Sequence, residues 1–405
     1  MVIAQNNIKK TEEVLNGYAE VSYIEELFSK NVGVSYIHHK NNPVLIGSDF
    51  LLKVNTSIGI SDPIFLDEEI RKIEAIRQCS TVSEYYHPDL VMDHTNVILK
   101  KPIWRYLVEI LDCPIGTVPV YSIGNEKSGI DKIKLLELVE EMAVCGVNFM
   151  TFHPTATLEL ATLAKNTRKI SSTSWGGSLV LEDLRINNRE RNVVADCYSE
   201  ILAILKKYNV TISIGSVFRP ARISQALDDV HKKETNEQRE YIEWAKRDGV
   251  NVIMEGMGHA TGKDIIRYCE LIKDHNVPIM PLGPMIFDSA IIEDNEVAAM
   301  GAYLMAYFGN LGIVNSVTRV EHLGGVPTID NVKEGLRSAV IVAHGVNIDR
   351  FPACCKIDNE VSDMREEKVS CVVEGGLFGV KIKDIGNSGC SRCNKQCPLK
   401  KNRRI

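Results

Sequence analysis

The sequence lacks the features that mark secreted, membrane-spanning and nucleic-acid-binding proteins. Its N-terminus turns polar after four residues, so no signal peptide is expected. A net charge of −6 gives no electrostatic reason to bind nucleic acid or an anionic membrane. The most apolar run, residues 298–314, could barely span a bilayer and contains Asn310, so it predicts a buried core helix. These absences predict a cytoplasmic protein that binds neither nucleic acid nor a membrane.

Two nucleotide-binding signatures are also missing. No GxGxxG motif follows the first predicted strand, and the Gly-rich turn at 174–178 has no lysine, which a P-loop requires. Cysteine, by contrast, is present eleven times. Eight of these cysteines are scattered along the chain, which indicates a reducing compartment and no disulfide framework.

A strand–helix repeat runs through the middle of the chain. Eight short β-branched runs predict strands at 51–57, 89–93, 116–121, 147–153, 169–174, 210–215, 250–255 and 277–282. Amphipathic stretches between them, such as 131–145, 191–208 and 263–275, predict helices. Alternation of this kind favours parallel strands, because each crossover needs a helix-length connection. Eight units in about 250 residues fit a (β/α)8 TIM barrel better than a doubly wound sheet.

Polar and sulfur-containing side chains gather at the predicted carboxyl ends of these strands. They are Met92, Asp93, Tyr121, His153, Ser174, Ser216 and Glu255. In a TIM barrel such positions surround one mouth, where catalysis takes place. Any one of them could be a structural cap, but their shared position predicts an active site.

Three cysteines near the C-terminus, Cys390, Cys393 and Cys397, are spaced for an inorganic centre. Three thiolates this close can hold three corners of a 4Fe–4S cluster and leave one iron open for a substrate or cofactor. A structural zinc ion is the main alternative, and its fourth ligand could come from Cys371 or from residues 354–355. Inert thiols are the third interpretation.

Two further constellations follow the later strands. Glycines flank Met257 in the segment from Glu255 to His259, and His322 follows the last predicted barrel helix. Two imidazoles with open positions suit zinc or a similar ion, although a single histidine in such a loop is more often a structural residue. The Gly-rich turn at 174–178 and Arg219 could bind a phosphate or a carboxylate. Alternatively, they could have only a structural role in their turns.

Taken in order, these motifs resemble the ThiC family of phosphomethylpyrimidine synthases and their 5-hydroxybenzimidazole synthase paralogues. The resemblance is carried by the motifs KVNTSIG at 53–59, VMD at 91–93, PIGTVPVY at 114–121, SWGGS at 174–178, SIG at 213–215, EGMGH at 255–259, LGP at 282–284 and EHLG at 321–324. It implies a (β/α)8 barrel and a homodimer in which the C-terminal cluster segment of one protomer serves the barrel of the other. It also implies a 4Fe–4S cluster, S-adenosyl-L-methionine, one mononuclear divalent metal (zinc or iron), and an electron donor such as flavodoxin or ferredoxin.

The resemblance assigns roles by position. Cys390, Cys393 and Cys397 would bind the cluster, and His259 with His322 would hold the metal. His153 and Glu255 are the expected catalytic residues. The expected substrate-binding residues for a nucleotide-like small molecule are Met92, Tyr121, His153, Ser174, Gly176, Arg219 and Glu255. The implied domains are a reduced N-terminal segment (1–48), the barrel (49–315), a helical segment with the metal-binding His322 (316–350) and an iron–sulfur segment (351–405).

Departures from the family pattern cluster at the mouth. Trp175, Ser216, Ser57 and Met280 stand where the family usually carries Arg, Asp, Asn and Tyr, and the second cysteine gap is one residue shorter. We therefore expect a radical S-adenosylmethionine lyase that rearranges aminoimidazole ribotide or a close relative, with altered substrate contacts. A paralogue making 5-hydroxybenzimidazole or acting on another heterocycle is the alternative, and a non-catalytic zinc-stabilised ligand-binding barrel is a third.

Overall fold

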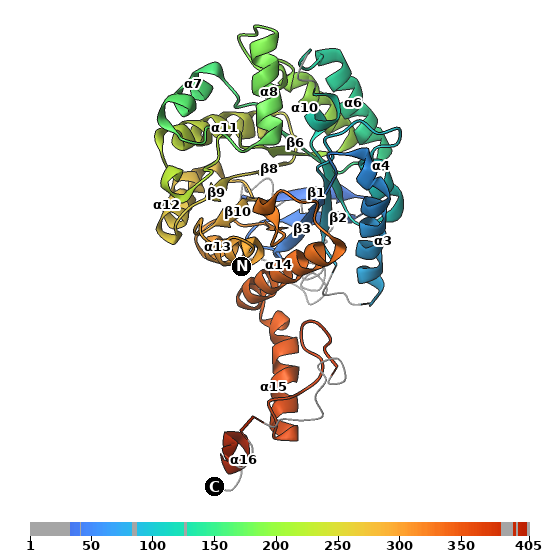
Figure 1. Ribbon diagram of the computed structural model, residues 1–405, viewed down its shortest axis with the longest axis vertical. Coiled ribbons are helices and arrows are strands. Elements are labelled where there is room, and N and C mark those ends of the chain that lie inside the picture. Colours follow the sequence, from blue (N-terminus) through green and yellow to red (C-terminus); the bar gives the residue numbers. More distant parts are fainter. Residues whose placement is uncertain are drawn as a thin grey trace.

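The computed structural model describes residues 33–40, 42–82, 87–124, 128–381, 392–393 and 396–402 (Figure 1). Its strands are β1 (Ser35–His39), β2 (Asn42–Ile46), β3 (Lys53–Ile58), β4 (Leu90–Asp93), β5 (Ile115–Thr117), β6 (Phe149–Phe152), β7 (Thr211–Ile214), β8 (Val252–Met254), β9 (Met257–His259), β10 (Leu282–Met285) and β11 (Ile313–Ser316). Its α-helices are α3 (Leu66–Val82), α4 (Ile103–Ile110), α5 (Pro119–Ile123), α6 (Lys132–Cys145), α7 (Leu158–Thr167), α8 (Trp175–Ile186), α9 (Val193–Asp196), α10 (Tyr198–Tyr208), α11 (Asp229–Arg247), α12 (Gly262–Ile272), α13 (Asp294–Phe308), α14 (Ile329–Arg350), α15 (Lys356–Lys368) and α16 (Pro398–Asn402).

Parallel strands form the centre of the molecule. Within the described residues, one seven-stranded sheet has the order β11-β3-β4-β5-β6-β7-β8. Ile279 joins its two edges through parallel bridges to Met254 and to Leu311. The amide of Met280 donates to Met254 O at 2.8 Å, and that of Gly312 donates to Ile279 O at 3.1 Å. The sheet therefore closes into a ring with helices outside it, and the predicted (β/α)8 barrel is confirmed.

Local signals account well for α6, one of the predicted helices. The Asp131 side chain accepts a hydrogen bond from the amide of Lys134 and caps its first turn. Gly146 ends the helix in the left-handed conformation, with φ of 102°, which glycine adopts without steric strain. Between these two caps, Leu135, Val139, Met142 and Ala143 are buried against the barrel, so this unit is specified by its own sequence.

Several predicted elements are wrong in detail. Residues 169–174 form no strand; their Ser side chains engage the local backbone instead, since Ser172 Oγ accepts from the amide of Ser174 and Ser174 Oγ from that of Gly177. The closing strand is instead β11, whose first two residues end the run 298–314 predicted to be a single helix; the helix itself, α13, ends at Phe308. The strand predicted at 116–121 stops at Thr117, because Pro119 starts α5. Tyr121 consequently lies on a helix rather than at a strand end.

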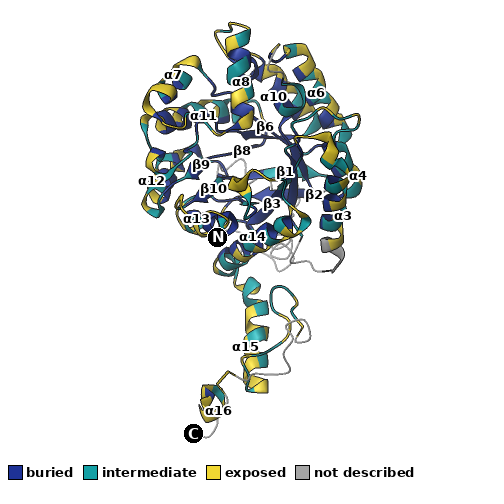
Figure 2. Ribbon diagram, in the orientation of Figure 1, coloured by how far each residue is buried: buried dark blue, intermediate teal, exposed yellow. Residues whose placement is uncertain are grey.

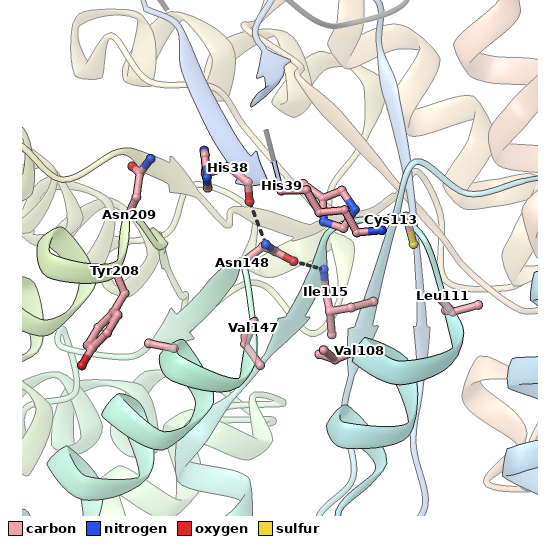
Figure 3. Close-up of a pocket in the computed structure, with 13 residues that line it drawn as sticks. His38, His39, Val108, Leu111, Cys113, Ile115, Val147, Asn148, Tyr208 and Asn209 are labelled. Atoms are coloured by element: carbon pink, nitrogen blue, oxygen red, sulfur yellow. Dashed lines mark hydrogen bonds between the residues drawn. The ribbon is translucent and has the colours of Figure 1, made fainter. Parts of the chain in front are cut away.

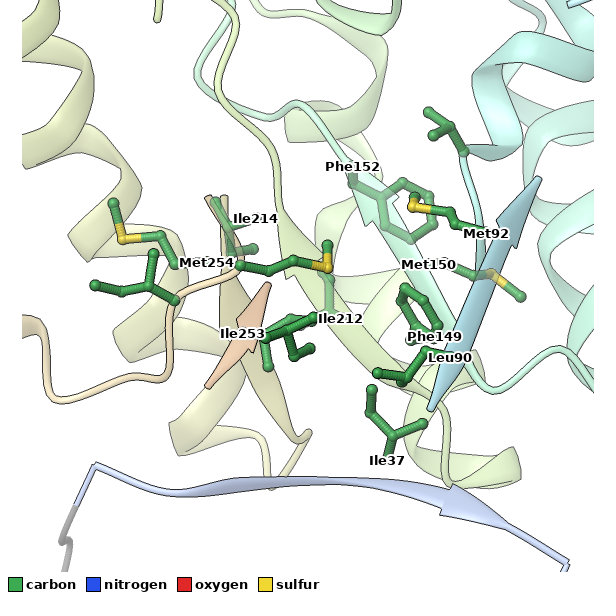
Figure 4. Packing of buried hydrophobic residues seen from close by; sticks show 14 of the residues in the cluster. Ile37, Leu90, Met92, Phe149, Met150, Phe152, Ile212, Ile214, Ile253 and Met254 are labelled. Carbon is green, nitrogen blue, oxygen red and sulfur yellow. The ribbon is translucent and has the colours of Figure 1, made fainter. Parts of the chain in front are cut away.

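The barrel core is apolar, and it continues into β1, which covers the amino end of the barrel. Ile37 of β1, Phe149 and Phe152 are all fully buried, and Figure 4 shows Ile37 close to Leu90 and Phe149. Burial of each such side chain contributes roughly 1.5–3 kcal/mol. Figure 2 shows the same division, with buried strands inside and helices whose outer faces are exposed. The core thus holds the strand ends in fixed positions.

The C-terminal part extends away from the barrel as an arm below α14 (Figure 1). His344 Nε2 lies 2.8 Å from Asp358 Oδ2, and the Arg337 guanidinium lies 4.6 Å from the centre of the Phe378 ring. These contacts join the arm to α14. Among the described helices, none has both the length and the hydrophobicity that a membrane span requires.

Gly116 on β5 offers a test of this packing. A Cβ at this position would lie 2.2 Å from the buried Phe149 ring, so Gly116→Ala should lower the free energy of unfolding by about 1–3 kcal/mol. The control is Gly325→Ala, because a Cβ there meets no atom within 4 Å. Urea unfolding followed by circular dichroism measures both variants. Equal stabilities would contradict the packing described here.

Candidate active site at the barrel mouth

Three of the predicted site residues directly follow neighbouring parallel strands. His153 comes after β6, Ser216 after β7 and Glu255 after β8, and all three are buried. Because parallel strands have their carboxyl ends at one side, these residues share the mouth of the barrel. The structure therefore brings His153 and Glu255 together as the strand pattern predicts.

The His153 ring is held between two glycines. A Cβ at Gly176 would lie 2.5 Å from its Cε1, and one at Gly215 would lie 2.7 Å from its Nε2. Either position must therefore stay free of a side chain for the imidazole to fit. No described group forms a hydrogen bond with its Nδ1. Burial, followed by the charges of Arg219 and His94, lowers the pKa of His153 to about 3, so the ring is neutral near pH 7.

Glu255 provides a carboxyl group at the same mouth. The Thr151 hydroxyl donates to its Oε1 at 3.3 Å. Burial raises its pKa, while Arg219 and Thr151 oppose that rise. A carboxyl group in this environment can take up and release a proton during a reaction.

Arg219 supplies positive charge on the loop that follows β7. Its guanidinium donates to Ser216 O at 3.2 Å and to Thr173 O at 3.4 Å. No ion pair to it occurs within the described ranges, so its remaining donors are available for an anionic ligand.

His94 joins this group, although the sequence argument did not select it. Its ring centre lies 6.0 Å from that of Tyr121 in an edge-on arrangement. Burial and the charge of Arg219 lower the pKa of His94 to about 4, and burial raises the pKa of Tyr121 to about 12. His94 could have been identified from its position in the sequence, because it directly follows β4.

Other predicted residues have structural partners. The Ser174 hydroxyl accepts from the amide of Gly177 at 3.0 Å and so caps α8. The Ser216 hydroxyl donates to Glu234 at 2.8 Å. Asp93 accepts hydrogen bonds from the amides of Thr95 and Trp104, and Met92 lies in the core near Phe152 (Figure 4).

His259 and His322 lie side by side, with ring centres 5.3 Å apart. His259 Nδ1 is 2.8 Å from Asp288 Oδ1, and His322 Nδ1 is 3.0 Å from Asp294 Oδ1. A carboxylate on Nδ1 leaves the Nε2 lone pair for a metal, which is the usual arrangement around a metal-binding histidine. No cluster of three or more metal-binding side chains occurs in the described part of the chain, so the fit is that of a two-imidazole site.

Of the three terminal cysteines, Cys390 lies outside the described residues. Cys393 is exposed and Cys397 is buried. The amide of Gln396 donates to Cys393 O at 2.9 Å.

A second hollow of about 300 Å³ lies at the opposite, amino end of the barrel (Figure 3). His38, Val108, Val147 and Tyr208 are among the residues that line it. None of the predicted site residues lines this hollow.

The neutral state of His153 predicts a pH dependence of stability. Its pKa is about 3 in the folded chain against 6.5 for a free imidazole, so below pH 6.5 only the unfolded chain takes up the proton. This histidine should therefore lower the free energy of unfolding by up to about 1.4 kcal/mol per pH unit as pH falls from 6.5. We expect His153→Gln to show a shallower fall in urea unfolding at pH 7, 6 and 5. Identical slopes would show that His153 titrates normally in the fold.

Comparison with known proteins agrees with the motifs at this mouth. The chain matches the radical SAM ThiC family model over residues 19–404. It is 32% identical over 360 residues to a phosphomethylpyrimidine synthase of Carboxydothermus hydrogenoformans, covering 86% of this chain and 80% of the relative. It is 29% identical over 381 residues to the 5-hydroxybenzimidazole synthase BzaA of Moorella thermoacetica, covering 88% of this chain and 85% of the relative. The chain belongs to the radical SAM ThiC family.

Proposed function

We propose that this protein is a radical S-adenosyl-L-methionine carbon–carbon lyase that rearranges aminoimidazole ribotide, or a close relative, to 4-amino-5-hydroxymethyl-2-methylpyrimidine phosphate for thiamine biosynthesis. The observation that carries the proposal is the mouth, where neutral His153, buried Glu255 and unpaired Arg219 lie together. A neutral imidazole, a proton-carrying carboxyl group and a guanidinium suit a heterocycle that bears a phosphate.

The side chains at the mouth have separable roles. Arg219 binds the phosphate through its free donors, and Glu255 holds or delivers a proton at the ring. His153 accepts a hydrogen bond from the substrate, because its imidazole stays neutral. Met92, Tyr121, Ser174 and Gly176 complete the proposed substrate-binding set.

Cys390, Cys393 and Cys397 would hold a 4Fe–4S cluster on the arm formed by residues 351–405. When bound, the cluster supplies the electron that cleaves S-adenosyl-L-methionine to a 5′-deoxyadenosyl radical, and a flavodoxin or ferredoxin would supply that electron to the cluster. The spacing of the three cysteines and the match to the radical SAM family support the assignment. A reduced set of cysteine ligands fits a reducing, cytoplasmic location.

His259 and His322 would hold one divalent metal, zinc or iron, beside the substrate. Asp288 and Asp294 orient the two rings by accepting from Nδ1. The remaining positions on the metal would be open to substrate atoms or water.

The arm supports a homodimer. It leaves the barrel at α14 and extends away from it (Figure 1). We propose that the arm of each protomer brings its cysteines to the mouth of the partner. The segment 316–350 then serves as the connection that also carries His322.

Trp175 favours the paralogue activity as a second candidate. Its indole is 47% exposed at the start of α8, beside Gly176, and it replaces the Arg that the family usually carries. A substrate without the ribotide phosphate, or a 5-hydroxybenzimidazole product, would fit this change. A zinc-stabilised barrel without turnover is the remaining alternative.

Anaerobic reconstitution tests the proposal. The protein should bind about four irons per chain and form 5′-deoxyadenosine, and mass spectrometry should detect the pyrimidine phosphate from aminoimidazole ribotide. Cys393→Ala and Cys397→Ala should lose both iron and 5′-deoxyadenosine, whereas Cys371→Ala, on the same arm, should keep them. Colourless protein with one tight zinc would contradict the radical activity, and 5-hydroxybenzimidazole as the product would favour the paralogue.

Trp175→Arg tests which substrate the mouth accepts. If the substrate carries a phosphate there, the new guanidinium should raise kcat/KM for aminoimidazole ribotide about 10- to 100-fold, the value of one charge-assisted hydrogen bond. Trp175→Ala is the control, because it removes the indole without adding charge. A fall in kcat/KM for both variants would indicate that the indole itself contacts the substrate.

A further inference from the structure

Glu234 on α11 is a buried carboxylate directly behind the loop that follows β7. Its side chain is fully buried. Its Oε1 accepts from the amide of Val217 at 2.6 Å and from the hydroxyl of Thr155 at 2.9 Å. Its Oε2 accepts from the amide of Phe218 and the hydroxyl of Ser216, both at 2.8 Å. Four donors therefore converge on one side chain, three of them from consecutive loop residues.

The carbonyl groups of the same loop are also held. Arg168 donates to Phe218 O at 2.6 Å, and Ser172 donates to Val217 O at 2.5 Å. Arg168 in turn forms a bidentate pair with Asp228, near the start of α11. Both edges of these peptide groups are thus fixed immediately before the chain reaches Arg219.

The next two residues connect this support to the mouth. Arg219 carries the guanidinium that the proposed function assigns to the substrate phosphate. Pro220 O accepts from the amide of His259 at 2.9 Å. A shift of residues 216–218 would therefore move the cation, and it would disturb the backbone next to a proposed metal ligand.

We propose that Glu234 is the positioning residue that places Arg219 in the mouth, and that Ser216 belongs to this support rather than to the substrate contacts. The proposal rests on the proposed function only for the identity of the ligand that Arg219 binds. It explains how Ser can stand at a position where the family usually carries Asp, because the Ser216 hydroxyl has a buried acceptor away from the mouth.

The geometry makes Glu234→Gln a sharp test. Each carboxylate oxygen accepts one backbone amide, Val217 on one and Phe218 on the other. Gln has one oxygen and one NH2 group, so either amide orientation sets a donor against a backbone N–H. An isosteric change therefore breaks the support without removing volume.

Hydrogen–deuterium exchange measures how firmly Glu234 holds the loop amides, and it does not require enzyme activity. In Glu234→Gln, the amides of Val217 and Phe218 should exchange at least about tenfold faster than in the wild type. Glu240→Gln, an exposed change on the same helix, should leave them unchanged. Unchanged exchange in Glu234→Gln would overturn the positioning role, even if the protein turned over no ribotide.

The kinetics of the reconstituted holoenzyme measure how the support by Glu234 affects substrate binding. Glu234→Gln should raise KM for aminoimidazole ribotide about 10- to 100-fold while KM for S-adenosyl-L-methionine stays the same. Ser216→Ala should change the ribotide KM less than about threefold, since the two amides remain bound. If Ser216→Ala alone reproduced the full rise, Ser216 would be a substrate contact and the proposal would fail.

Two further outcomes are distinguishable. Glu234→Asp keeps two acceptor oxygens on a shorter stem, so it should recover part of the ribotide KM. If Glu234→Gln does not fold, Glu234→Asp takes its place in the test. A ribotide KM as high for Glu234→Asp as for Glu234→Gln would contradict the role of the two acceptor oxygens. Absence of ribotide turnover in the wild type would count against the proposed function, while exchange would still decide the role of Glu234.

Discussion

Closure of the strand ring is the constraint on which the rest of the structure depends. Residues 278–280 form backbone hydrogen bonds with Met254 of β8 on one side. On the other side they form backbone hydrogen bonds with the chain just before β11. Glu255 directly follows β8, and His322 follows β11. Without the link at Ile279 these residues would stand on opposite edges of an open sheet, and the mouth would not contain both the proposed substrate groups and the histidine pair.

Closure also sets the electrostatics of the mouth. Side chains at the strand ends lose contact with water, which lowers the pKa of His153 and His94 and raises that of Glu255. Arg219 strengthens the neutral state of both imidazoles, because a second positive charge nearby is unfavourable. The mouth therefore keeps the Arg219 cation, and an anionic group of a ligand is the natural partner for it.

Much of the fold could be predicted from local pattern, and the failures share one cause. The helix at α6 and strands such as β6 carry their own signals in caps and β-branched residues. Residues 169–174 resemble a strand locally but have no strand partner within the described residues, and β11 is decided by β3, a partner distant in the sequence. At the site, His153 and Glu255 were predictable from their place after strands. Side-chain direction was not: Ser216 was correctly placed after β7, but its hydroxyl bonds to Glu234. Ser174 was predicted at the end of a strand that does not form, and it caps α8 instead. Glu234, Asp288 and His94 were missed, because only the folded chain brings each of them to its partners.

The parts of the mouth differ in how easily they can change. His153 is confined by two glycines, and Arg219 follows a loop whose amides and carbonyls are all engaged. Substitution at those points disturbs several buried contacts at once. Trp175, by contrast, is 47% exposed and has no aromatic or cation–π partner within the described part of the chain. A residue at that rim can be exchanged without repacking the core, so substrate range can diverge there while the buried machinery stays the same. Packing therefore constrains the buried positions of the mouth far more than it constrains the residue at the rim.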